Sequence, residues 1–381
     1  MWTPGPVIAV LLTVFAATAK TRAAPPDVPA PAASGDGEGA APGDGGASAL
    51  DDWSVIPILF YTPETSLGFG VAVIHSFDAS SGPSPLSTLG AGVIVTAEEQ
   101  LILRLQPDVR FDDALLQGAV RFQRYPTRFF GPDADPDDEG EPFDELAFWS
   151  TLDARYRLGR TGTPWEAVSV GARCDVHWNE VTAVEDGGRL AREAPLGVDP
   201  LVGLGCGPVV AWDTRDDVRL PSRGALIEAR VMAWTALYGD PFIAAAGEVD
   251  VRGYLELGAG HVLAGHLRVR TVAGELPFQL LPRLGGSNEM RGWFEGHLRA
   301  RSTFLAQLEW RLPLFWKLGA AVFASAGQAF PRWRDFGWDG MRFAGGAGLR
   351  YLLNVRQSVR VRFDVAWGSD LAAYVDVLES F

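Results

Sequence analysis

The sequence predicts an all-β fold: a transmembrane antiparallel β-barrel of about sixteen strands, with a long loop folded into its lumen. Segments of about ten residues alternate apolar and polar side chains from Trp53 to the end of the chain. Aromatic residues, Trp234 and Trp310 among them, gather near the ends of these segments, as in the interfacial girdles of such barrels. The connections between segments alternate short and long, which is typical of outer-membrane barrels.

The first fifty residues differ from the rest. The apolar run Val7 to Ala17 is too short to span a bilayer as a helix, and small residues follow it at Ala19 and Ala23. We therefore interpret residues 1–23 as an export signal peptide, although its first residues lack Lys and Arg. Residues 24–50 contain almost no large apolar side chain, so we expect a disordered Ala/Gly/Pro-rich tether. The barrel is expected over residues 51–381.

The alternation is clear in residues 101–111, where Leu103 and Leu105 are apolar and Arg104 and Gln106 are polar. A water-soluble sandwich would show the same alternation, so the aromatic girdles and the loop lengths decide in favour of a barrel. The expected strands are 55–61, 67–77, 87–96, 100–111, 114–126, 145–158, 165–178, 201–213, 223–236, 241–256, 260–273, 303–312, 317–327, 342–353, 357–368 and 371–381.

An even number of strands places both ends of the barrel on one side of the membrane, and the exported tether makes that side the periplasm. The long connections all follow odd-numbered strands and are therefore expected to face outward. They are residues 127–144, 179–200, 274–302 and 328–341.

Composition argues against several functions. The net charge of −14, from 33 basic and 47 acidic residues, argues against nucleic acid as a partner, because neutralising phosphates needs a basic surface. We interpret the carboxylate-rich stretch 133–145 as a solvated loop. The five histidines show no metal-ligand spacing and no nucleophile stands out, so we expect neither a cofactor nor enzymatic activity. His266 beside Ser and Asp of other strands could in principle form a hydrolase site, but strand histidines more often fill a lumen.

The two cysteines are predicted to be cross-strand neighbours. Cys174 and Cys206 lie on consecutive strands, on one inferred face, at similar distances from the centre of the intervening loop. Export would permit a disulfide. Two reduced cysteines facing lipid are an equal alternative, because directly paired strand positions often have poor disulfide geometry.

The candidate functional segment is the glycine-rich loop Leu-Gly-Gly-Ser-Asn-Glu-Met-Arg-Gly-Trp at residues 284–293. Gly285, Gly286 and Gly292 are expected to supply positive φ angles or close backbone approach. Arg291, which precedes Gly292 and Trp293, is placed to carry a guanidinium deep into a polar cavity.

Several motifs resemble the barrel of the superfamily that includes BamA, TamA and FhaC, also called the bacterial surface antigen family. Besides the Arg-Gly-Trp loop, Asp213, Arg215 and Asp216, followed by Pro221 to Gly224, are similar to its Asp-x-Arg-Asp, Pro-x-x-Gly turn. Residues 308–313 are similar to its Glu-x-Arg-x-Pro strand end, and residues 346–351 with 362–364 resemble its last hairpin. The resemblance covers about 330 residues. It implies a sixteen-stranded barrel with the arginine on the loop after strand eleven.

The chain departs from this family in two places. Members that assemble or translocate proteins usually carry periplasmic polypeptide-transport-associated domains, whereas only about fifty residues precede this barrel, as in the truncated branch. The family's Phe-x-Asp-x-Gly is here Phe-Ala-Ser-Ala-Gly, with Ser325 in place of the aspartate that receives the loop arginine. A buried guanidinium needs acceptors, so we predict that Glu309 or Asp364 replaces this aspartate. The alternative is that Arg291 binds only water and backbone carbonyls.

The resemblance implies a bacterial outer-membrane protein that assists insertion or translocation of polypeptides, or of lipids. The route would be a lateral seam, with Ile56 to Tyr61 pairing with Ala372 to Phe381. The implied partners are outer-membrane lipids, unfolded outer-membrane protein clients and a periplasmic accessory protein. The alternatives are a passive pore or structural barrel and, with less support, a lipid-modifying enzyme.

Overall fold

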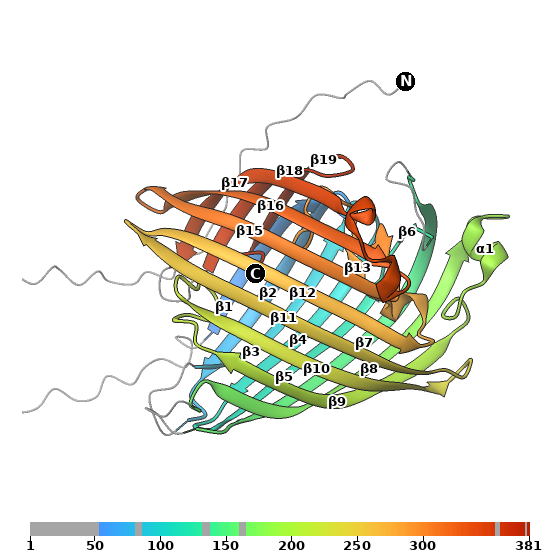
Figure 1. The fold of residues 1–381 in the computed structure, drawn as a ribbon, viewed down its shortest axis with the longest axis horizontal. Coiled ribbons are helices and arrows are strands. Elements are labelled where there is room, and N and C mark those ends of the chain that lie inside the picture. Colours follow the sequence, from blue (N-terminus) through green and yellow to red (C-terminus); the bar gives the residue numbers. More distant parts are fainter. Residues whose placement is uncertain (1–52, 81–85, 132–137, 160–164, 355–358, 378) are drawn as a thin grey trace, which may run out of the picture.

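The computed structural model describes residues 53–80, 86–131, 138–159, 165–354, 359–377 and 379–381. Sixteen wall strands form a closed antiparallel barrel (Figure 1), which confirms the predicted fold class and strand number. The wall strands are β1 (Trp53–Thr62), β2 (Ser66–Phe77), β3 (Ser87–Thr96), β4 (Leu101–Arg110), β5 (Ala114–Arg124), β7 (Glu141–Arg157), β8 (Val168–Val184), β9 (Leu201–Asp213), β10 (Gly224–Tyr238), β11 (Ile243–Gly258), β12 (His261–Gly274), β15 (Ser302–Phe315), β16 (Leu318–Phe330), β17 (Arg342–Asn354), β18 (Val359–Trp367) and β19 (Leu371–Val377).

Alternation along each strand separates a lipid-facing surface from the lumen. In β15, Leu308 and Trp310 are 52% and 44% exposed, whereas Gln307, Glu309 and Arg311 are buried inside the barrel. Large apolar side chains exposed on the outside, with charged ones enclosed, are the arrangement of a membrane barrel. Among the described residues, no helix is long and apolar enough to span a membrane.

The wall extends further than expected next to two loops. Strand β7 begins at Glu141 and β8 ends at Val184, so both reach into segments predicted as loops. The short strand β6 (Thr127–Phe129) pairs with the start of β7. These extensions are stabilised by an apolar cluster that Phe129 and Phe143 form with residues of two loops.

The prediction of a solvated acidic loop at 133–145 is wrong for its last part. Glu141 and Glu145 are buried. The Glu141 carboxylate accepts the backbone N–H groups of Arg189 and Leu190 at the start of α1 (Arg189–Glu193), which compensates its burial. Residues 132–137 lie outside the described residues.

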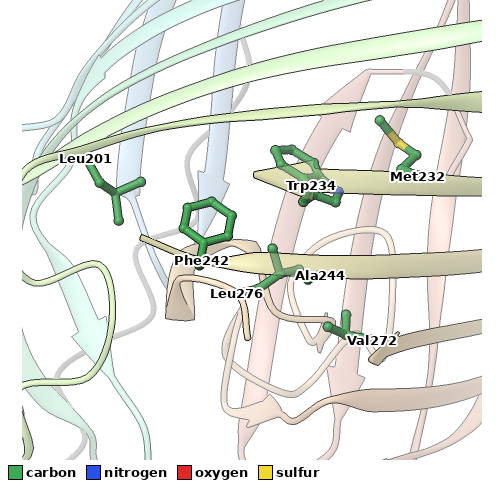
Figure 2. Packing of buried hydrophobic residues seen from close by; sticks show 7 residues of the cluster. All are labelled: Leu201, Met232, Trp234, Phe242, Ala244, Val272 and Leu276. Atoms are coloured by element: carbon green, nitrogen blue, oxygen red, sulfur yellow. The ribbon is translucent and has the colours of Figure 1, made fainter. Parts of the chain in front are cut away.

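The lumen has an apolar core on one side. Figure 2 shows that its side chains come from β9 to β12 and from the long loop after β12; they are Leu201, Met232, Trp234, Phe242, Ala244, Val272 and Leu276. Trp234 was predicted to lie in an outer girdle, but its position in β10 is inward and it is only 7% exposed. The long loop therefore packs on the barrel wall by hydrophobic contact as well as by polar bonds.

Cys174 and Cys206 are directly paired on β8 and β9, with Cα atoms 4.2 Å apart, and the structure joins them as a disulfide. Of the two alternatives that the sequence left open, the structure has the bonded one.

The lipid-facing assignment of β15 predicts a depth-dependent cost. Leu308→Arg, in the middle of β15, should destabilise the barrel by about 2–4 kcal/mol, whereas Phe315→Arg, at the end of the strand, should cost about 0–1 kcal/mol. Equilibrium unfolding in phospholipid vesicles would measure both. Equal costs at the two positions would contradict a membrane around this face.

Candidate functional site in the barrel lumen

The loop between β12 and β15 descends into the lumen and depends on glycine. It includes the 3₁₀ turn η1 (Phe278–Leu280) and a small hairpin, β13 (Arg283–Leu284) with β14 (Leu298–Arg299). Gly285, Gly286 and Gly292 have φ angles of 110°, 89° and 103°. A Cβ atom at Gly292 would lie 2.5 Å from the backbone nitrogen of Gly368, so only glycine lets the loop tip approach the wall this closely.

Arg291 at the loop tip is 1% exposed and bridges two carboxylates. One terminal nitrogen (Nη1) donates to Asp364 at 2.6 Å, and the other (Nη2) donates to Glu309 at 2.8 Å. Its guanidinium carbon lies 3.4 Å from the centre of the Phe323 ring. The Ser325 hydroxyl donates instead to the carbonyl of Ala344. The structure thus brings together Arg291, Glu309 and Asp364, and Ser325 takes no part in this bridge.

Three further arginines complete the cluster, and sequence reasoning missed them. Arg311 donates to Glu309 at 2.9 Å, Arg350 donates to Asp364 at 2.5 Å, and Arg362 donates to Asp364 at 3.3 Å. All three are almost fully buried. Their signal was present in the alternation, because each occupies an inward position of its strand. The two carboxylates are therefore shared among four guanidinium groups, which lowers the cost of enclosing so much charge.

The loop tip also binds the last strand, β19. The Gly292 N–H donates to the hydroxyl of buried Tyr374 at 2.9 Å, and the Ser287 hydroxyl donates to Asp376 at 2.9 Å. Trp293 donates its ring N–H to the carbonyl of Phe343 on β17 at 3.1 Å. Together with Asp364 on β18, which binds Arg291, three neighbouring strands are thus fixed to one segment of the loop.

The same loop contacts the beginning of the barrel. The Glu295 N–H donates to the carboxylate of Glu64, in the turn between β1 and β2, at 2.8 Å. Glu64 is buried, and this burial, with the Glu295 carboxylate nearby, raises its pKa to about 7. Contacts to Glu64 on one side and to Tyr374 on the other place the loop across the junction of the first and last strands.

That junction is the weakest pairing in the wall. Among the residues that the structure describes, β1 and β19 are in register only at Tyr61 and Val375, whereas β1 pairs with β2 at ten positions and β19 with β18 at seven. We call this β1–β19 junction the seam.

The predicted extent of the seam is wrong, because the chain leaves the wall after Val377. The Phe381 side chain is buried in the lumen with Tyr254, Val262 and Ala264. The Glu379 carboxylate accepts from Arg350 at 2.8 Å and from Arg360 at 2.6 Å. Lumenal arginines and an apolar pocket thus hold residues 379–381 away from β1.

The predicted turn motif forms a local network at the opposite end of the wall from the loop. Arg215 donates to both carboxylate oxygens of Asp213 at 2.9 and 2.8 Å. Asp216 accepts the backbone N–H groups of Ser222 and Arg223, and Gly224 has a φ of 92°. These contacts close the connection between β9 and β10.

Removing the Arg291 side chain should release the loop. We expect amide hydrogen exchange across residues 283–299 to accelerate by at least ~10-fold in Arg291→Ala, because one hydrogen bond to a charged group contributes ~1.5–3 kcal/mol. The exchange rate in Arg291→Lys should lie between those of wild type and Arg291→Ala, since an ammonium lacks the planar fork with which a guanidinium spans two carboxylates. The control is Arg332→Ala, whose arginine is exposed outside the loop. An unchanged exchange rate in Arg291→Ala would contradict a role of Arg291 in holding the loop in the lumen.

Ionisation of buried Glu64 should destabilise the folded protein. Because its pKa is raised from 4.5 to about 7 in the folded state, the folded protein holds this proton more tightly than the unfolded chain. Stability should therefore fall as the pH rises through that window, by up to ~3 kcal/mol. Unfolding of wild type and Glu64→Gln in detergent between pH 4 and 8, about the range set by these pKa values, would isolate the contribution of Glu64 to the free energy of unfolding. Parallel pH profiles would contradict it.

Comparison with known proteins agrees with this geometry. Residues 206–374 match the model of the Omp85 superfamily domain. The fold is similar to BamA from Haemophilus ducreyi lacking POTRA domains 1–3, with a TM-score of 0.58, 13% identity, and coverage of 86% of this chain and 70% of that one. A search of curated proteins finds no match.

Two further structures share the fold. CdiB from Acinetobacter baumannii has a TM-score of 0.54 and 11% identity, and CdiB from Escherichia coli has 0.52 and 9%. The matches cover 86% and 85% of this chain, which spans 59% and 62% of the two CdiB chains. The domain match over residues 206–374, the sixteen wall strands and the arginine-bearing lumen loop lead to one conclusion: the chain forms a β-barrel of the bacterial outer membrane that is similar to the Omp85 superfamily.

Proposed function

We propose that this barrel assists polypeptides in entering or crossing the outer membrane through the seam between β1 and β19. The observation that carries the proposal is the single registered pair, Tyr61 with Val375. Opening this junction breaks few backbone hydrogen bonds, each worth about 0.5–1.5 kcal/mol, compared with opening the ten-pair junction of β1 and β2. The unpaired backbone of an edge strand is a template for another strand.

The lumen loop allows the seam to open without unravelling the barrel. Tyr374 and Asp376 on β19 bind the loop tip, and Glu64 beside β1 binds Glu295 of the same loop. Either seam strand can therefore lose its neighbour while it remains attached to the loop. This arrangement favours a seam that opens while β1 and β19 both stay anchored to the loop.

The proposed clients are extended segments of unfolded outer-membrane proteins. Such segments expose strand edges that β1 or β19 could pair with. The match of residues 206–374 to the Omp85 superfamily domain supports a role in insertion or translocation in general. We further propose that a periplasmic accessory protein delivers these clients, and that the surrounding lipid accepts them. Lipids themselves are the alternative cargo.

The filled lumen argues against the alternative of a passive pore. The loop adds an apolar cluster on one wall and the Arg291 cluster on another. A remaining cavity of about 270 Å³ is lined by side chains that include Trp149, His177 and Arg270. A pore would require the loop to leave, which the buried ion pairs oppose.

Locking the seam should abolish the proposed activity. A Tyr61→Cys/Val375→Cys pair, in a Cys174→Ser/Cys206→Ser background, would cross-link the seam on oxidation. We expect wild-type and reduced variant barrels to accelerate folding of a urea-unfolded client barrel into liposomes, and the oxidised variant not to.

The matched control is Val55→Cys/Val73→Cys, which cross-links the permanent β1–β2 pair in the same background. It should retain activity in both redox states. Client folding at an undiminished rate with a locked seam would refute the route. Ion conductance without any effect on client folding would support the pore instead.

A further inference from the structure

The loop of residues 331–341, between β16 and β17, folds over the outside of the barrel wall. We call it the outer-wall loop. The Phe336 ring lies 5.3 Å from the rings of both Phe304 and Phe330, and the Trp333 ring lies 5.2 Å from Phe330. Phe304 and Phe330 occupy outward positions, because the adjacent residues along their strands, such as Leu305, point into the lumen, and their strand partners Gln328 and Ser302 share their outward face.

The exposed fractions of outward side chains along β15 and β16 also show that the loop covers one end of these strands. Outward residues of β15 and β16 are exposed at mid-strand, with Leu308 and Val322 each 52% accessible. Near the loop, outward Ser302, Gln328 and Phe330 fall to 2%, 5% and 1%. Since the lipid-facing side of a wall strand should remain accessible, something must cover this end, and the outer-wall loop does.

Polar bonds hold the loop against the wall. The Gln328 side chain donates to the carbonyl of Asp335 at 3.2 Å and accepts the N–H of Gly337 at 3.2 Å. Gly340 packs so closely on Gln328 that a Cβ would lie 2.1 Å from its side-chain nitrogen. These contacts fix two 3₁₀ turns, η2 (Trp333–Asp335) and η3 (Trp338–Gly340), outside the barrel.

The loop presents large aromatic side chains outward. Trp333, Phe336 and Trp338 are 55%, 40% and 83% exposed. The neighbouring outward side chains at the ends of β17 and β18, Phe343 and Trp367, are 61% and 66% exposed and continue the surface. Exposed tryptophans are unfavourable in water and favourable where an apolar ring meets lipid headgroups.

The outer-wall loop has no net charge that would favour a charged partner. Within the loop, Arg332 and Arg334 are balanced by Asp335 and Asp339, and Asp335 pairs with Arg332 at 3.0 Å. An aromatic surface of no net charge, continuous with a lipid-facing wall, fits the headgroup layer of a membrane better than a charged ligand.

We propose that the outer-wall loop is a lipid-contacting element that places Trp333 and Trp338 in the headgroup layer of the adjacent leaflet. The sequence predicts that the chain enters and leaves the barrel on the periplasmic side and that residues 328–341 face outward. The adjacent leaflet is therefore the outer leaflet. The loop then sets the depth of the β15–β17 side of the barrel in the membrane. This role does not depend on the seam function.

A spin label at Asp339→Cys tests the contact. Barrels in phosphatidylcholine nanodiscs would be probed by collision with oxygen, which enters lipid, and with a water-soluble nickel chelate. The control label is Asp186→Cys, exposed in the connection before α1. We expect the Asp339 label to be shielded from nickel and accessible to oxygen, and the Asp186 label to show the reverse.

A second variant separates anchoring from simple proximity. In Trp333→Ser/Trp338→Ser, the Asp339 label should lose its shielding from nickel, while heat-modifiable gel mobility shows an intact barrel. A wild-type loop label as open to nickel as the Asp186 label would overturn the proposal and leave the aromatics to a soluble partner. Shielding that survives the double substitution would also overturn it, because the tryptophans would not be the anchor.

Discussion

The bridge from Arg291 to Glu309 and Asp364 is the interaction on which the rest of the lumen depends. It fixes the tip of a long loop at a depth where neither partner could remain charged alone without a large desolvation cost. The glycines on either side let the backbone come close enough to the wall for this bridge to form. Once the tip is fixed, the apolar part of the loop is held against β9 to β12.

The loop thereby becomes the common support of two strands that barely support each other. Tyr374 belongs to the last strand and Glu64 adjoins the first, and both bind residues of the loop within five positions of Arg291. An ordinary barrel is stable because every strand has two complete neighbours. In this barrel, the lumen loop supplies part of the stabilisation that β1 and β19 do not give each other.

Much of this could be predicted from sequence, because strand period, loop asymmetry and inward parity are local properties. They predicted the wall strands, and the loop motif singled out Arg291. The need of a buried guanidinium for acceptors then pointed to the inward-facing Glu309 or Asp364. The inward course of residues 379–381 could not be predicted, since Phe381 looks like one more strand residue until the lumenal partners of Glu379 are known. Trp234 failed for a related reason: the alternation gives two faces, and only packing shows that the inward face is partly apolar.

The disulfide between Cys174 and Cys206 has a mechanical consequence. It joins the seventh and eighth wall strands, nearly diametrically across from where the sixteenth meets the first. A cylinder that parts along one line must flex along the far side, and a covalent staple there prevents that side from shearing. When the seam opens, β8 and β9 would then keep their register, and bending would be confined to the strands between the disulfide and the seam.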